Sequence, residues 1–170
     1  QDVRVMIIKL CDRLHNMRTG DAWPEQKRRD KALETMEVYA PIAHRLGISN
    51  IKEELEDRSL QYLDPVGYNM IRSLLNKHGD DFLNDICATI QEHLKQNGIH
   101  GATIRHRVKS IYGIYRKMYM QNKDFEEIYD IYAVRIIIDT VAECYTALGL
   151  IHDMYHPLPN RFKDYISTPK

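Results

Sequence analysis

Three cations and one carboxylate in the second half of the chain could together hold a polyphosphate and a divalent metal ion. Arg107 and Lys109 share one face of an expected strand, and Lys117 lies on the helix that follows, whose start could receive phosphate at its free N–H groups. Asp130 precedes a β-branched run, and its oxygens suit Mg²⁺ that carries a nucleotide's phosphates. Such clustered positive charge calls for an anionic ligand, unless it forms only a solvated basic face.

Arg135 lies five residues beyond Asp130, inside the apolar run at 132–138. We interpret this run as a buried strand, in which an unpaired guanidinium would be very costly. Arg135 is therefore expected to meet either a ligand or a carboxylate. The alternative to a ligand site is a purely structural pair between Asp130 and Arg135.

A second group of cations, Arg161, Lys163 and Lys170, surrounds Asp164 after a proline-containing loop. Three cations within ten residues, around a short strand expected near 165–166, predict a phosphate clamp. A charged surface loop explains the same residues equally well when this segment is considered alone.

Polar residues also continue the apolar stripe of the first predicted helix. Asp12, Asn16 and Thr19 follow one another at intervals of four and three residues, so they share one helix face with apolar side chains. We expect them either to be buried and paired, with an arginine and the backbone, or to line a cleft. His15 lies close to this face, where a lone histidine is more typical of structure than of a ligand.

The elements that position these residues are of two kinds. The first hundred residues repeat apolar side chains at helical spacing, with Gly47, Asp64 and Pro65 among the residues that separate the repeats. The pattern predicts helices over about 3–19, 24–46, 50–63, from 64 onward and over 80–97. This part should therefore form a helical bundle.

The pattern changes near residues 97–102. Strands are predicted over 102–108, over 132–138 and near 165–166, with helices over about 109–121 and 141–155 between them. The sequence therefore predicts an α+β fold, in which an N-terminal all-α bundle is followed by the start of a mixed α/β sheet layer.

Composition limits the classes of function. The 170 residues include 24 Lys plus Arg and 24 Asp plus Glu, so no overall field favours nucleic acid or an anionic membrane. No apolar run approaches the roughly 20 residues of a membrane span, and no signal peptide is recognisable. Cys11, Cys87 and Cys144 are far apart among apolar neighbours, which indicates buried reduced thiols in a cytoplasmic protein.

The order of these segments resembles one known family. The segments KLCDRLHNMRT, VYAPIAHRLGI, RVKSIYGIYRKM, EIYDIYAVRII and RFKDYISTPK resemble the RelA/SpoT homologues, the bifunctional (p)ppGpp synthetase/hydrolases of the bacterial stringent response. The resemblance covers essentially the whole chain. It implies the end of an HD-type hydrolase domain at 1–48, a helical linker bundle at 49–100, and the first half of a nucleotidyltransferase-like synthetase domain at 101–170.

The resemblance implies metal ligands in both activities. In the hydrolase, Asp12 would be the last ligand of Mn²⁺ and Asn16 would contact the nucleotide. In the synthetase, Asp130 would be a catalytic residue that holds Mg²⁺. One synthetase motif exists in a basic form, RxKD, in the bifunctional members of the family. The segment Arg161–Asp164 resembles this basic form.

The remaining implied roles concern the two nucleotides of the synthetase. Arg107 and Arg135 would hold ATP by stacking on adenine, and Lys109 and Lys117 would contact its phosphates. On the guanine-nucleotide side, the resemblance implies a catalytic Lys163 and a binding Lys170.

The implied reaction transfers the β,γ-pyrophosphate of ATP to the 3′-hydroxyl of GDP or GTP, with Mn²⁺-dependent hydrolysis of (p)ppGpp as the second activity. The parent enzyme would be a GTP pyrophosphokinase and (p)ppGpp 3′-pyrophosphohydrolase. Its ligands would be ATP, GDP or GTP, and (p)ppGpp. No membrane and no direct nucleic-acid binding is expected of this chain, and association of the full-length parent with the ribosome is left open.

Two residues depart from the family pattern, which has glycine at both positions. Asn160 is a mild change because asparagine tolerates positive φ. His106 is expected to bring a side chain into a loop that approaches the ligand closely.

The chain reads as a fragment of a longer protein, cut at both ends. We expect it alone neither to make nor to hydrolyse (p)ppGpp, because it carries one implied hydrolase ligand and one implied synthetase carboxylate. Two alternatives remain: a nucleic-acid-binding module that uses the basic segment 105–121, and a degenerate, non-catalytic interaction domain.

Overall fold

The computed structural model describes residues 2–76 and 80–169, which form two compact units. Among these residues, the first unit comprises 2–76 and 109–131, and the second comprises 80–108 and 132–169. The described chain is mostly helical with a two-stranded antiparallel sheet, which confirms the α+β class. No helix in this described part is long and apolar enough to cross a lipid bilayer.

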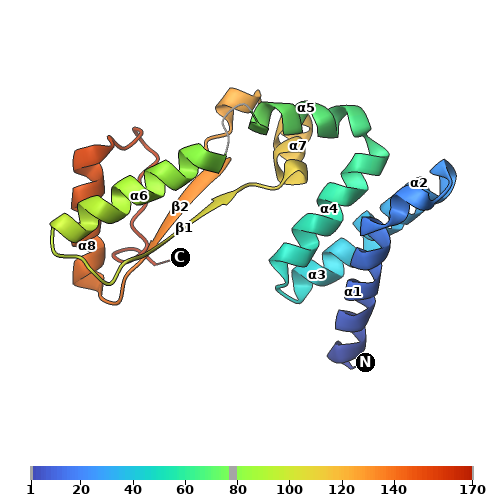
Figure 1. Ribbon diagram of the computed structural model, residues 1–170, viewed down its shortest axis with the longest axis horizontal. Coiled ribbons are helices and arrows are strands. Elements are labelled where there is room, and N and C mark those ends of the chain that lie inside the picture. The colour runs from blue at the N-terminus through green and yellow to red at the C-terminus, as the bar shows by residue number, and fades with distance from the viewer. Residues whose placement is uncertain (1, 77–79, 170) are drawn as a thin grey trace. The chain divides into compact units, whose positions relative to one another are not determined.

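The first unit is built from helices (Figure 1). They are α1 (Val3–Arg18), α2 (Glu25–Glu34), α3 (Ala40–Arg45), α4 (Ser49–Leu63), α5 (Pro65–Asn76) and α7 (Ile111–Met120), with short turns η1 (Gly20–Ala22) and η3 (Phe125–Glu127). The helix predicted over 24–46 contains a π-helical segment, η2 (Thr35–Tyr39). Gly47 ends this stretch with a φ of 72°, a left-handed conformation that glycine adopts without strain.

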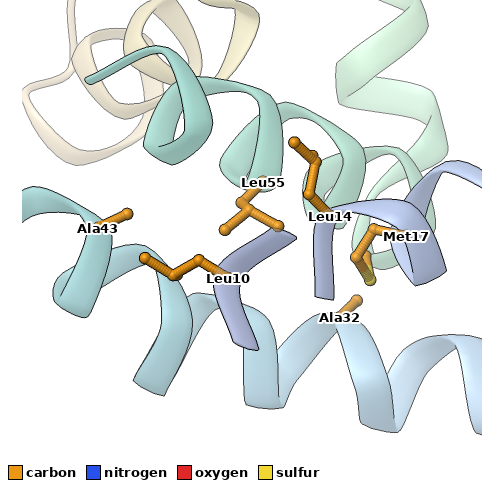
Figure 2. Close-up of a cluster of buried hydrophobic side chains, with 6 residues drawn as sticks. All are labelled: Leu10, Leu14, Met17, Ala32, Ala43 and Leu55. Carbon is orange, nitrogen blue, oxygen red and sulfur yellow. The ribbon is translucent and has the colours of Figure 1, made fainter. Parts of the chain in front are cut away.

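The core of the first unit lies where α1 meets α2, α3 and α4. Leu10, Leu14 and Met17 of α1 form a buried cluster with Ala32, Ala43 and Leu55 (Figure 2). The alanines of α2 and α3 are completely buried or nearly so in this cluster. The predicted helical spacing of the apolar residues is thereby confirmed.

The second unit places two helices against a two-stranded sheet. It contains α6 (Asp80–Gln96), β1 (Thr103–Val108), β2 (Tyr132–Ile137) and α8 (Val141–Met154). The strands are antiparallel, and Ile104 pairs with Ile136. Ile104, Val134 and Ile136 pack against buried residues of α6 and α8, so one sheet face belongs to the core and the other is open.

Two predictions about this unit are wrong. The segment at 165–166 is a turn and not a strand, because the Asp164 carboxylate accepts hydrogen bonds from the backbone N–H groups of Ile166 and Ser167. The strand at 132–137 is not buried on both faces, because the helices cover only one of them, and Ile137 remains 43% exposed.

The cysteines are free thiols, but they are not all buried as expected. Cys11 is exposed on α1, and Cys87 and Cys144 are half-buried. Cys11 directly follows the buried Leu10, so the helical turn carries its side chain away from the core.

Candidate functional site

Three residues predicted to bind a nucleotide's phosphates and metal meet in the first unit. Lys109 Nζ lies 3.0 Å from Asp130 Oδ2, and Lys117 Nζ lies 2.6 Å from Asp130 Oδ1. Each carboxylate oxygen therefore receives one ammonium group. Asp130 pairs with lysines of its own unit, which is not the arginine pair considered as the alternative.

The backbone brings these residues together. The Lys109 N–H donates to the carbonyl oxygen of Ile131 at 2.7 Å, which fixes the segment around Asp130 beside the start of α7. Lys117 lies almost two turns into α7, on the side that carries its ammonium group to the same carboxylate. Lys109 and Asp130 are 21 residues apart in the sequence, and the backbone hydrogen bond and the helix α7 bring them together.

The cluster is charged and open to solvent. Partial burial raises the pKa of Asp130, but the hydrogen bonds from Lys117 and Lys109 outweigh it and lower the pKa to about 2. The carboxylate is 52% exposed, and the lysines are 21% and 26% exposed. An ionised acid with two cations within reach of solvent can exchange these partners for a metal ion and an anionic ligand.

The expectation that the start of α7 offers free N–H groups to phosphate is wrong. Its first N–H groups are not free: those of Ile111 and Tyr112 donate to Asp57 Oδ2 at 3.2 Å and Oδ1 at 2.7 Å. The N–H of Gly113 donates to Ser110 Oγ at 3.2 Å. An anion at this helix start would have to displace a carboxylate that belongs to the protein.

A second cluster, which we call the arginine face, lies on the open face of the sheet in the second unit. Arg105 pairs directly with Arg135, and Arg107 is two residues further along β1, so the alternation of strand side chains puts all three on one face. All three side chains are exposed. The expectation that Arg135 is buried, and must therefore be paired, is wrong.

Sequence reasoning missed Arg105 as a member of this face. The signal was present, because Arg105 and Arg107 are separated by the two-residue period of a strand. Within residues 2–76 and 80–169, none of the three guanidinium groups of the arginine face has an ion-pair partner.

His106 does not lie in a loop as expected. It lies within β1, and the strand alternation places it on the face opposite to Arg105 and Arg107. Its Nδ1 atom is 3.7 Å from Sγ of Cys87 on α6. His106 therefore lies on the helix-covered side of the sheet.

The loop after α8 holds its acid in a structural role. Asp164 accepts hydrogen bonds from two backbone N–H groups and from the hydroxyl of Tyr145, whereas Lys163 is exposed. Asn160 has a φ of 62°, as its tolerance of this conformation predicts. Lys170 lies outside the described residues.

Asp12 and Asn16 of α1 are paired with each other, and Thr19 after the helix is bonded to the backbone. Asn16 Nδ2 donates to Asp12 Oδ2 at 3.1 Å, and the Thr19 hydroxyl donates to the carbonyl oxygen of His15 at 3.1 Å. The face is open, because Asp12 is exposed and Ile8, earlier on the same stripe, is 67% exposed. Within the described ranges, Asp12 has no arginine as an ion-pair partner, so the pair considered as one alternative is not found there.

The carboxylates suit a metal ion only with further ligands. In the described ranges, no group of three or more His, Cys, Asp or Glu side chains is arranged to hold one. Asp130 nevertheless fits Mg²⁺, which commonly binds one or two carboxylates together with substrate phosphates and water. Asp12 alone offers Mn²⁺ a single carboxylate.

Comparisons with known proteins agree with the motifs. Residues 106–170 match the family described as a region found in RelA / SpoT proteins, and residues 1–49 match an HD domain. Among curated relatives, a probable guanosine-3′,5′-bis(diphosphate) 3′-pyrophosphohydrolase of Synechocystis is 49% identical over all of this chain and 23% of its own length. A GTP pyrophosphokinase of Myxococcus xanthus is 46% identical with the same coverage, and one of Streptomyces coelicolor is 45% identical over 20% of its length. The chain thus spans about a quarter, or less, of the length of these relatives.

Proposed function

This chain belongs to the RelA/SpoT family, and we propose that it contributes to a bifunctional enzyme of (p)ppGpp metabolism. The enzyme would transfer pyrophosphate from ATP to the 3′-hydroxyl of GDP or GTP, and would hydrolyse (p)ppGpp. Residues 1–48 would end the hydrolase domain, 49–100 would form the linker, and 101–170 would begin the synthetase domain. The observation that carries the synthetase proposal is the meeting of Lys109 and Lys117 at Asp130.

In the proposed synthetase, Lys109 and Lys117 exchange partners when the nucleotide binds. Without nucleotide, the two ammonium groups neutralise Asp130. With nucleotide, they move to its phosphates, and the carboxylate becomes available to a metal ion. Mg²⁺ held by Asp130 would neutralise phosphate charge and fix the phosphates in position. The lysines would supply the remaining charge compensation, so the contribution of these residues is positioning and electrostatic stabilisation.

The arginine face would bind the adenine end of ATP. Arg107 and Arg135 are exposed and lack ion-pair partners in the described part of the chain, so their planar groups are available to stack on a base. Lys163, exposed after α8, and Lys170 would line the guanine-nucleotide side. For the hydrolase, Asp12 would contribute one ligand to Mn²⁺ and Asn16 would contact the nucleotide, once the hydrogen bond between them opens.

Calorimetric titration of the chain with ATP, with and without Mg²⁺, tests the synthetase proposal. We expect Mg²⁺-dependent binding that is lost in Asp130→Ala, because the variant lacks the carboxylate for the metal. Asp30→Ala, which removes an exposed acid on α2, serves as the control and should bind as the unmodified chain does. Equal binding by Asp130→Ala, or a steeply salt-dependent affinity for RNA in place of ATP, would contradict the proposal.

A further inference from the structure

A carboxylate of the helical bundle holds the start of the helix that carries Lys117. Asp57 lies on α4 and accepts hydrogen bonds from the N–H groups of Ile111 and Tyr112, the first two residues of α7. These residues follow Asp57 by 54 and 55 positions. The side chain of Ser110, the local N-cap, accepts a hydrogen bond from the N–H of Gly113. The first turn of α7 is therefore held by its own cap and by Asp57 of α4.

The environment of Asp57 is unfavourable for a charge. Burial raises the pKa of Asp57 to about 6, and the nearby carboxylates of Glu56 and Glu53 act in the same direction. The two backbone N–H groups of α7 favour the ionised form. Burial deprives the Asp57 carboxylate of hydration, and the hydrogen bonds from α7 offset this cost.

Two further contacts fix α7 on the same bundle. The Tyr115 hydroxyl donates to Asp64 Oδ2 at 3.0 Å, and Asp64 itself lies at the junction of α4 and α5. Gly67 of α5 lies so close to α7 that an added Cβ would be 2.9 Å from Tyr115 Cε2. Ile114, which lies between Tyr112 and Tyr115 in the sequence, is fully buried. The helix is thus held at its first turn and again one turn later.

These attachments lie between the two lysines of the phosphate cluster. Lys109 precedes Ile111 by two residues, and Lys117 follows Tyr112 by five. A rotation or shift of the first turn of α7 would therefore move both ammonium groups relative to Asp130. A displacement of about 1 Å at such a site is enough to weaken positioning substantially.

We propose that Asp57 is a positioning residue: by holding the first turn of α7, it keeps Lys109 and Lys117 directed at the same carboxylate. The use of this positioning in nucleotide binding rests on the proposed function. The role differs from that of a phosphate ligand, because Asp57 is an anion and acts through the backbone of α7. It also ties the geometry of the synthetase cluster to a helix of the linker.

The test compares Asp57 with the local cap of the same helix. Asp57→Ala removes both acceptors, Asp57→Asn retains one side-chain acceptor, and Ser110→Ala removes a cap of α7 without touching α4. The first readout is the ¹H–¹⁵N signal of the Lys109 and Lys117 ammonium groups, which ion pairing protects from exchange with water. The second is the affinity for ATP with Mg²⁺, measured by calorimetry on the same samples.

We expect both readouts to be highest in the unmodified chain, lower in Asp57→Asn and lowest in Asp57→Ala. The affinity of Asp57→Ala should be about tenfold lower, the equivalent of one charge-assisted hydrogen bond. Ser110→Ala should keep both ammonium signals and change the affinity less than about threefold. This should hold even if its melting temperature falls as far as that of Asp57→Ala. If Asp57→Ala does not fold, the comparison of Asp57→Asn with Ser110→Ala decides.

Unchanged ammonium signals in the Asp57 variants would overturn the positioning role. Equal losses in Ser110→Ala and Asp57→Ala would overturn it as well, because the effect would then reflect the general stability of α7. If the unmodified chain shows ammonium signals that respond to Asp57 but binds no ATP, the positioning role holds and the proposed nucleotide function fails.

Discussion

Arg105 lies directly opposite Arg135 in the antiparallel pairing of β1 and β2. Side chains that face each other across such a pair are close neighbours, and two like charges in these positions destabilise the sheet. Exposure to solvent reduces this repulsion but does not remove it. The pair is therefore unfavourable in the free chain and favourable once an anion or a π-face lies over it.

Removal of one charge should separate these two effects. We expect Arg105→Gln to stabilise the free chain by about 0.3 kcal/mol in urea unfolding, because the repulsion by Arg135 disappears. The same variant should bind ATP with Mg²⁺ several-fold more weakly. Arg107→Gln is the matched control for stability, because Arg107 faces Ala133 and no cation. A destabilised Arg105→Gln would show that its side chain contributes more by packing than its charge costs.

The helices and the main strands followed from the sequence, because apolar spacing reports which face an element buries. The exposure of Arg135 did not follow from the sequence, because a β-branched run is typical of strands covered on both sides, and this sheet is covered on one. The strand expected at 165–166 failed because Asp164 takes up the backbone N–H groups that a strand would use. Local hydrogen bonds can thus override β-propensity.

The site was predictable in its residue types but not in its contacts. The spacing of Lys109, Lys117 and Asp130 suggested phosphate and metal, yet the pairing depends on the backbone hydrogen bond between Lys109 and Ile131. Asp57 gave no signal, because its partners are backbone N–H groups more than fifty residues away. Contacts of this kind depend on tertiary structure, which one sequence does not report.

Lys117 should contribute to nucleotide affinity through its charge. We expect Lys117→Met to weaken the binding of ATP with Mg²⁺ by about tenfold or more, because a charge-assisted contact to phosphate is worth about 1.5–3 kcal/mol. Lys123→Met, in the exposed segment after α7, removes the same charge and should change the affinity less than about twofold. Calorimetric titration of both variants decides, and equal losses would indicate a diffuse electrostatic effect.

Glu54 should stabilise the bundle at neutral pH and not in acid. Hydrogen bonds from Arg18, and then from Arg58, lower its pKa from 4.5 to about 2 against a smaller opposing effect of burial. A lowered pKa in the folded state stabilises the fold above pH 4.5, and this contribution is lost as the pH falls through about 2.

We therefore expect Glu54→Gln to lower the free energy of unfolding by about 1 kcal/mol at pH 7, the scale of a solvent-screened ion pair. The difference from the unmodified chain should disappear near pH 2. Glu37→Gln, at an exposed position of η2, is the control. Denaturant unfolding at several pH values gives the result, and a pH-independent difference would assign the loss to packing.

Asp57 should have the opposite pH dependence. Burial raises its pKa from 3.8 to about 6 in the folded chain, so the folded state takes up a proton that the unfolded state lacks between these values. The stabilisation from this group is complete below pH 3.8 and is lost as the pH rises through about 6.

Relative to Asp57→Asn, the unmodified chain should therefore gain about 2 kcal/mol of stability as the pH falls from 7 to 4. The subtraction of the two unfolding curves cancels the titration of other acids, including Glu56 and Glu53. A difference that stays constant over this range would show that Asp57 titrates at its ordinary pKa.

Gly67 of α5 should not tolerate a side chain, whereas Gly149 of α8 should tolerate one. An added Cβ at Gly67 would lie 2.5 Å from Asp64 Oδ2 and 2.9 Å from Tyr115 Cε2, so Gly67→Ala must displace the Asp64 carboxylate and the Tyr115 ring. We expect a loss of about 1–3 kcal/mol in the free energy of unfolding, as is usual for overpacking. An added Cβ at Gly149 in α8 would meet no atom within 4 Å, and Gly149→Ala should stabilise the chain by about 0.5–1 kcal/mol through helix propensity. Urea unfolding of both variants measures the contrast; a stable Gly67→Ala would mean that α5 and α7 are less tightly packed than the contacts of Tyr115 indicate.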